Sequence, residues 1–174
     1  KAIWAPYAWT DAYRDRYYHG GILNYGFMQG WLRTADNLRL SPEHRDAMNE
    51  VGMRERVGAA LEDPEISAVP FLRGALERPN EGAHPLLVDV ITRPLDGDYW
   101  RERSVDYTRG PDIPACLGGC WAIYGLHLPG AFRSWQNWRG PKRLVLGPPV
   151  YLDRPVYQYL YEQLRWFDLW LKDN

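Results

Sequence analysis

Two short apolar runs in the second half of the sequence limit the possible folds more than any other feature. Residues 114–119 and 142–147 are each about the length of one strand, and both end in glycine. Such runs are typical of strands buried on both faces of a parallel sheet. The spacing of apolar residues predicts a helix over 127–138 and another over 155–172. This alternation of strand and helix predicts a right-handed parallel α/β unit.

The rest of the chain is predicted to be mostly helical. A short apolar run at residues 1–5, closed by Pro6, predicts one more strand. Thr10 is a plausible N-cap, and Ser41 followed by Pro42 is a strong helix start. Helices are expected at residues 10–18, 25–38, 41–61, 65–77 and 97–103, with a loop at 78–85. The fold class is therefore α/β, with a mostly helical segment followed by a short parallel sheet and its flanking helices.

Composition excludes several classes of partner. The 174 residues carry a formal net charge of −1, so they lack the basic surface of a nucleic-acid-binding protein. No apolar run reaches the roughly 20 residues that span a bilayer, and the first residues lack the layout of a signal peptide. Neither nucleic acid nor membrane is expected as a partner. The two cysteines do not form a disulfide framework, which favours a cytoplasmic location.

Tryptophan and tyrosine are unusually frequent, with 9 and 12 copies against 4 of phenylalanine. Amphipathic aromatic side chains at this density occur in cores with polar rims and in the walls of pockets that bind organic ligands. Both interpretations stay open. The candidates for a pocket wall are aromatic residues near the N-terminus and two side chains that follow the 114–119 run: Tyr7, Trp9, Tyr13, Tyr17, Tyr18, Phe27, Trp31, Trp121 and His127.

Five local patterns occur in an order that resembles one family of hydrolases. They are DAYRD at 11–15 with HGGI at 19–22, DYWRERS at 98–104, IPACLGG at 113–119 followed by Trp121, PKRLVLGP at 141–148, and LRWFDLWLK at 164–172. Together they are similar to the cocaine esterase and X-Pro dipeptidyl-peptidase family of α/β-hydrolases. The resemblance implies ester or amide hydrolysis by a Ser, Asp and His triad, with no metal and no cofactor.

The resemblance also implies a division of the chain into domains. Residues 1–10 would enter the hydrolase domain, 11–95 would form a helical cap, and 96–174 would form the C-terminal part of the hydrolase domain. In the family the serine stands in a Gly-x-Ser-x-Gly turn before the strand that matches residues 1–5. That serine is expected upstream of residue 1. The chain is expected to be a fragment that needs the preceding part of the hydrolase domain.

The triad positions within the chain hold other residues. The position of the acid reads Ala122, and the loop expected to carry the histidine reads Pro149, Val150 and Tyr151, with no histidine through residue 154. None of the four serines, Ser41, Ser67, Ser104 and Ser134, stands in a nucleophile turn. No catalytic residue is therefore assigned. We expect a fragment of a serine hydrolase that is inactive alone, acting on a small ester or amide if its parent is active. The alternative is a non-catalytic relative that serves as a binding or structural module.

Two weaker alternatives involve the cysteines. Cys120 could act as a nucleophile with His127 seven residues later, but a cysteine in apolar surroundings is usually just buried. Cys116, Cys120 and His127 could also bind a metal, although no fourth ligand is nearby. For His127 itself the plain interpretation is a capping or packing role.

Overall fold

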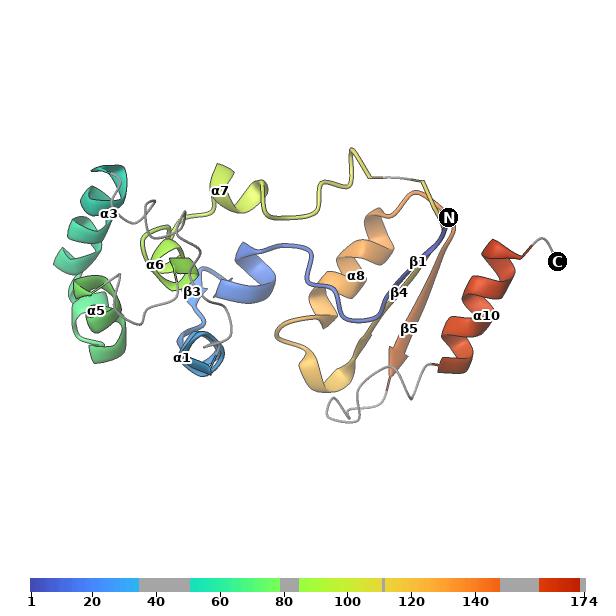
Figure 1. Ribbon diagram of the computed structural model, residues 1–174, viewed down its shortest axis with the longest axis horizontal. Helices are drawn as coiled ribbons and strands as arrows, with labels where there is room; N and C mark the ends of the chain where they lie inside the picture. The colour runs from blue at the N-terminus through green and yellow to red at the C-terminus, as the bar shows by residue number, and fades with distance from the viewer. Residues whose placement is uncertain (35–50, 79–84, 111, 148–159, 173–174) are drawn as a thin grey trace. The chain divides into compact units, whose positions relative to one another are not determined.

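The computed structural model describes residues 1–34, 51–78, 85–110, 112–147 and 160–172 (Figure 1). The chain divides into two compact units. The first combines Lys1–Gly20 with Asp96–Asn174, and the second is Gly21–Leu95. No helix in the described part of the chain is long and apolar enough to cross a membrane.

The first unit is built on a three-stranded parallel sheet. Its strands are β1 (Ile3–Ala5), β4 (Ala115–Cys120) and β5 (Lys142–Gly147), in the order β1-β4-β5. The register pairs Ile3 with Ala115 and Ala115 with Lys142, so the strands begin level with one another. All six residues of β4 are buried, as expected for a central strand. The predicted α/β class and its three strands are confirmed.

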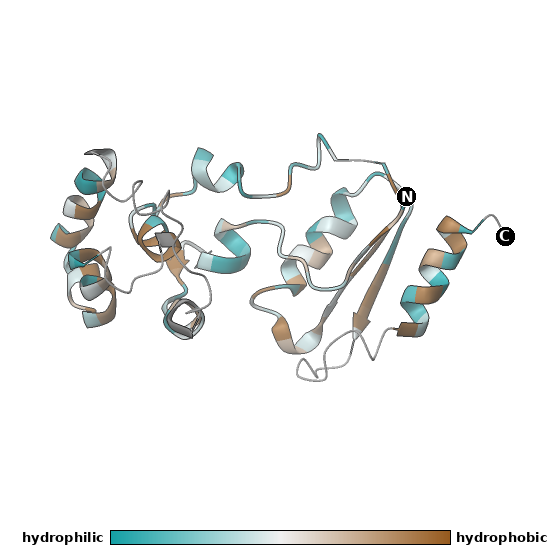
Figure 2. Cartoon of the chain, in the orientation of Figure 1, coloured by the Kyte–Doolittle hydropathy of each residue, from teal (hydrophilic) through white to brown (hydrophobic). Residues whose placement is uncertain are grey.

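Strand β5 differs from the expectation of a strand buried on both faces. Only Gly147 is buried, Arg143 is exposed, and the other four residues are half-buried. Among the described strands β5 pairs with β4 alone, so it forms an edge of the sheet and keeps contact with solvent. Figure 2 shows hydrophobic residues over the later part of this strand, which reads LVL after Lys142 and Arg143, and this apolar run is why the sequence pattern resembled that of a buried strand.

Two helices cover opposite faces of the sheet (Figure 1). On one face α8 (Leu128–Asn137) places the side chains of Leu128 and Ala131 beside Gly119 of β4. On the other face α10 (Leu160–Leu171) is fastened by Trp166, whose Nε1 donates to the carbonyl of Ile3 at 2.9 Å. The helices predicted at 127–138 and 155–172 are thus confirmed where the structure describes them.

Short elements complete the first unit. These are the π-helix η1 (Tyr13–Tyr17), β2 (Tyr18–His19), α7 (Asp98–Arg101) and the 3₁₀ turn η2 (Trp121–Ile123). The helix predicted at 10–18 is therefore only a five-residue π-turn, and Thr10 does not cap it. The reason is Asp15, whose carboxylate accepts hydrogen bonds from the backbone N–H groups of Thr10 and Asp11. Those bonds hold the preceding segment in a non-helical path.

The second unit is mostly helical, as predicted. It contains β3 (Ile22–Leu23), α1 (Tyr25–Thr34), α3 (Val51–Glu62), α4 (Pro64–Ser67), α5 (Pro70–Glu77) and α6 (Pro85–Ile91). The single helix predicted at 65–77 is two helices, because Asp63 caps α4 and Pro70 starts α5. Helix α6, whose Leu87, Val88, Val90 and Ile91 are buried, was not predicted. The helix start at Ser41 lies outside the described residues.

Substitution of alanine for glycine is expected to have opposite effects at Gly58 and Gly20. In α3 a Cβ added at the exposed Gly58 would meet no atom within 4 Å, so Gly58→Ala is expected to stabilise the helix by about 1 kcal/mol. Gly20 has φ +62°, so Gly20→Ala is expected to destabilise by about 1 kcal/mol. Urea titrations followed by circular dichroism compare the two variants, and a shift of both midpoints in the same direction would contradict this assignment.

Candidate functional site

The carboxyl ends of β1 and β4 are the natural place for a site. In open α/β sheets, ligands bind outside the carboxyl ends of the strands. Strand β1 runs into Pro6 and Tyr7, and β4 runs into η2 and then α8. Strand β5 runs into residues 148–159, which lie outside the described residues, as do Pro149, Val150 and Tyr151 of the loop predicted to replace the histidine.

No carboxylate follows β4 directly. The turn η2 reads Trp121, Ala122 and Ile123, and the next acidic residue of the chain is Asp153. Trp121 is 54% exposed and Tyr124 is 76% exposed. Ala122, which stands at the predicted position of the acid, lies in this turn and has no group that could orient an imidazole.

His127 is the first histidine in the sequence after this turn, and it is only 8% exposed. It occupies the N-cap position of α8 without capping the helix through its side chain. Its ring meets the edge of Tyr7 at 5.9 Å between centroids. Burial lowers the pKa of the imidazole below its ordinary value, Arg16 lowers the pKa further, and Asp15 opposes both. A neutral imidazole is therefore favoured at neutral pH, which is the form that accepts a proton.

Asp15 is fully buried and connects the segment after β1 to α8. Its Oδ2 accepts hydrogen bonds from Thr10 N at 3.0 Å, Asp11 N at 2.9 Å and Arg133 Nη1 at 2.6 Å. Gly130 makes this approach possible, because a Cβ at that position would lie 2.7 Å from the carbonyl oxygen of Ala8. The sequence analysis missed this cluster, since Asp15 and Arg133 are 118 positions apart.

Comparison with known proteins decides the family. The family model of the X-Pro dipeptidyl-peptidase (S15 family) matches residues 1–150, which include all three strands of the sheet and the helical unit. The chain belongs to the X-Pro dipeptidyl-peptidase (S15) family. The predicted resemblance is confirmed, and the chain is a relative of hydrolases. No curated protein and no solved structure gives a significant match.

The predicted pocket-wall residues of this S15 chain separate into several groups. Tyr13, Tyr17 and Tyr18 are buried around Trp100, with ring centroids 5.9, 5.5 and 6.0 Å from it, so they contribute core packing. The remaining candidates are the Tyr7–His127 pair, Trp9 under the guanidinium of Arg16 at 5.1 Å, the stacked Phe27 and Trp31 of α1, and the exposed Trp121. A common pocket wall for them stays a prediction.

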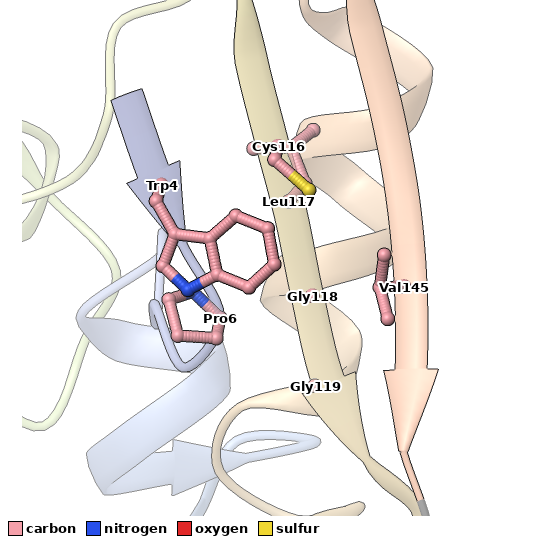
Figure 3. Close-up of a pocket in the computed structure, with 7 residues that line it drawn as sticks. All are labelled: Trp4, Pro6, Cys116, Leu117, Gly118, Gly119 and Val145. Carbon is pink, nitrogen blue, oxygen red and sulfur yellow. The ribbon is translucent and has the colours of Figure 1, made fainter. Parts of the chain in front are cut away.

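The sheet of this S15 chain also carries a narrow apolar hollow (Figure 3). Its lining residues are Trp4, Pro6, Cys116, Leu117, Gly118, Gly119 and Val145, and it is too narrow to admit a water-sized molecule. Burial raises the pKa of the Cys116 thiol to about 11, so this thiol stays protonated at neutral pH. Cys120 is fully buried. These surroundings suit packing and disfavour a cysteine nucleophile.

The described serines of the S15 chain are held in structural hydrogen bonds. Ser67 Oγ donates to the carbonyl of Leu61. Ser104 Oγ donates to the carbonyl of Trp100 at 2.8 Å, and Ser134 Oγ lies 2.8 Å from the Tyr107 hydroxyl. Ser41 lies outside the described residues. Within the described residues no serine is hydrogen-bonded to a histidine, as a serine nucleophile would require.

The depressed pKa of His127 predicts a pH dependence of stability. Between its folded pKa and the ordinary value of 6.5, the unfolded chain binds a proton that the folded chain rejects. The contribution of His127 to stability is therefore complete above pH 6.5 and is lost as the pH falls below it. Urea titrations at pH 7.5 and 5.5 should show a smaller loss of stability for His127→Gln than for the wild type. An equal loss in both proteins would refute the assignment.

Proposed function

We propose that the chain forms one half of an acyl-hydrolase site that acts on small-molecule esters or amides. The observation that supports this most directly is the buried His127 beside Tyr7 at the carboxyl ends of β4 and β1. A base at this edge of a parallel sheet is what nucleophilic hydrolysis requires. The family match supports the reaction class, since the chain is an S15 relative over residues 1–150.

The nucleophilic serine of this site is proposed to come from outside the 174 residues. The sequence contains no Gly-x-Ser-x-Gly turn, and the described serines are used in structural hydrogen bonds. No described strand pairs with the outer edge of β1, so that edge can receive another strand in parallel. An exposed edge of this kind also favours association over a free monomer.

An ester-hydrolysis assay on the purified chain tests this proposal. The 174-residue chain is expected to release p-nitrophenol from p-nitrophenyl acetate no faster than its His127→Gln variant does in the same buffer. Saturable turnover by the chain alone would contradict the proposal, because it would require a nucleophile among residues interpreted as structural.

A non-catalytic binding module is the second candidate, and Ala122 is the observation that favours it. A Ser-His-Asp triad needs a carboxylate to orient its imidazole, and the turn after β4 holds Ala122 and no carboxylate. The two candidates differ in the sequence upstream. A Gly-x-Ser-x-Gly turn within the preceding ~30 residues, the size of one βαβ unit, supports the hydrolase. Its absence, with ester binding but no turnover, supports the module.

The location of the protein is also a proposal. The two cysteines are free thiols in the structure, although Cys116 and Cys120 stand only four positions apart. Free thiols are typical of a reducing compartment. We propose a cytoplasmic location on this ground. The formal net charge of −1 separately argues against nucleic acid as a partner.

A further inference from the structure

Several buried polar atoms have no hydrogen-bond partner within the described residues, and two of them belong to a carboxylate and an imidazole beside α8. These two are Oδ1 of Asp15 and Nδ1 of His127. A buried polar atom without a partner is unfavourable, and native proteins satisfy nearly all of them. One atom is a carboxylate oxygen, which accepts a hydrogen bond. The other is an imidazole nitrogen, which can donate one.

Asp15 of η1 packs against the turn of α8 that His127 begins. The N–H of Ala131 donates to the carbonyl of His127 at 3.0 Å, so His127 belongs to the first turn of the helix. Gly130, three residues later, lies on the same face as His127. A Cβ at Gly130 would lie 3.2 Å from Oδ2 of Asp15. The carboxylate therefore lies against the helical turn that His127 begins.

The charges around the two groups suit such a pair. Arg133, three residues beyond Gly130, balances the carboxylate through its 2.6 Å contact with Oδ2 and leaves Oδ1 unused. Arg16 stacks on Trp9 and Tyr17, with its guanidinium 5.1 and 5.0 Å from their ring centroids. Tyr7 packs on the imidazole. The groups whose charge acts on His127 are thus Asp15, which favours the imidazolium, and Arg16, which disfavours it.

We propose that Asp15 and His127 are the acid–base pair of the hydrolase site, with Nδ1–H of His127 donating to Oδ1 of Asp15. This inference rests on the proposed function. The structure has no hydrogen bond between the two atoms, so the imidazole ring must rotate to close the pair. Asp15, which follows β1, would then supply the orienting carboxylate that Ala122 does not.

The pair has a defined role in hydrolysis. With Nδ1 bonded to Asp15, Nε2 is the free basic atom. Nε2 takes the proton of a serine or water hydroxyl as the oxygen of that hydroxyl bonds to the acyl carbon. The imidazolium then gives this proton to the leaving alcohol or amine as its bond to the acyl carbon breaks. His127 is the catalytic base, and Asp15 is a positioning residue that acts through the imidazole.

Nitrogen-15 NMR of the full chain with labelled histidine tests the pair through the tautomer of His127. The proposal predicts that the neutral ring carries its proton on Nδ1, and that Asp15→Asn loses the Nδ1–H signal. Asn keeps a side-chain oxygen for the N–H groups of Thr10 and Asp11, so the segment can still fold. Asp11→Asn is the matched control, because Asp11 pairs with Arg14 and should leave the tautomer unchanged.

The wild-type spectrum decides the matter even where the variant does not fold. A neutral His127 that carries its proton on Nε2 would overturn the pair, and so would an unchanged Nδ1–H signal in a folded Asp15→Asn. The tautomer is measured without any substrate. If the pair forms but the protein extended upstream through a Gly-x-Ser-x-Gly turn has no esterase activity, the proposed function fails and the hydrogen bond stands. Activity of the extended protein with an Nε2–H tautomer would defeat the pair alone.

Discussion

Replacement of Asp15 by alanine is expected to destabilise the first unit by about 3–5 kcal/mol. The carboxylate is fully buried and accepts hydrogen bonds from two backbone N–H groups and from Arg133. Removing one member of a buried ion pair leaves the other without compensation, and this is the costly change. In Asp15→Ala the guanidinium of Arg133, whose side chain is 30% exposed, loses its ion-pair partner. The N–H groups of Thr10 and Asp11 lose their hydrogen-bond acceptor.

Urea unfolding followed by tryptophan fluorescence measures this effect. Asp11→Ala is the matched control, because it removes a carboxylate four residues earlier that pairs with Arg14, whose side chain is 55% exposed. Asp11 also accepts a hydrogen bond from the backbone N–H of Arg14 at 2.8 Å, so Asp11→Ala is expected to cost about 1 kcal/mol, well below the cost of Asp15→Ala. Equal losses of stability in the two variants would show that Asp15 is not the anchor of this segment.

Replacement of Gly130 by alanine is expected to cost about 1–3 kcal/mol, the range for forcing an extra methyl group into a packed site. The new Cβ would lie 2.7 Å from the carbonyl oxygen of Ala8 and 3.1 Å from the nitrogen of Thr10. Both are backbone atoms, so the segment after β1 must move away from α8. The variant should also weaken the contact between Asp15 and Arg133, since the methyl group meets Oδ2 at 3.2 Å.

Gly119→Ala provides the control for Gly130→Ala. Gly119 is also buried and faces α8, but its Cβ would meet Leu128 and Ala131 at 3.5–3.7 Å, which is ordinary van der Waals contact. The free energy of unfolding of that variant should lie within about 1 kcal/mol of the wild-type value. If Gly130→Ala is as stable as Gly119→Ala, the close approach of the two segments is absent in solution.

The sheet could be predicted because its signals are local. The runs at 114–119 and 142–147 carry apolar residues over the length of a strand and end in glycine, and the structure has β4 and β5 within one residue of those bounds. Helix α8 was predictable from the apolar residues of 127–138, but its buried face was not: Phe132 and Trp135, predicted on the apolar side with Ala131, are exposed, whereas Leu128, Ala131 and Ser134 are buried. The exposure of β5 was not predictable, because it depends on which strand occupies the edge.

The segment after β1 could not be predicted because long-range contacts determine it. Residues 10–18 have the composition of a helix, yet Asp15 binds Thr10 and Asp11 and reaches Arg133 far along the chain. A single sequence shows a charged residue among other charged residues there, with no sign that it is buried. One signal was available: a glycine in the first turn of a helix often marks a close approach of backbone.

The candidate site was predictable in part. His127 stood out because it follows the predicted strand and begins the predicted helix, and the structure adds Tyr7 and a buried Nδ1 to it. The aromatic residues gave a less specific signal, because Tyr13, Tyr17 and Tyr18 bury their rings around Trp100 for packing. Composition alone does not separate a core from a pocket wall.

One measurement tests the central claim, that this S15 chain supplies the base of an acyl-hydrolase site whose serine lies outside it. The protein is extended upstream through the open reading frame to include a Gly-x-Ser-x-Gly turn, and p-nitrophenyl acetate hydrolysis is compared with that of the 174-residue chain. Turnover is expected only in the extended protein, with a loss of about 10²-fold or more in His127→Gln, the contribution of a general base. Absence of turnover in both proteins, or turnover that survives His127→Gln, would contradict the account.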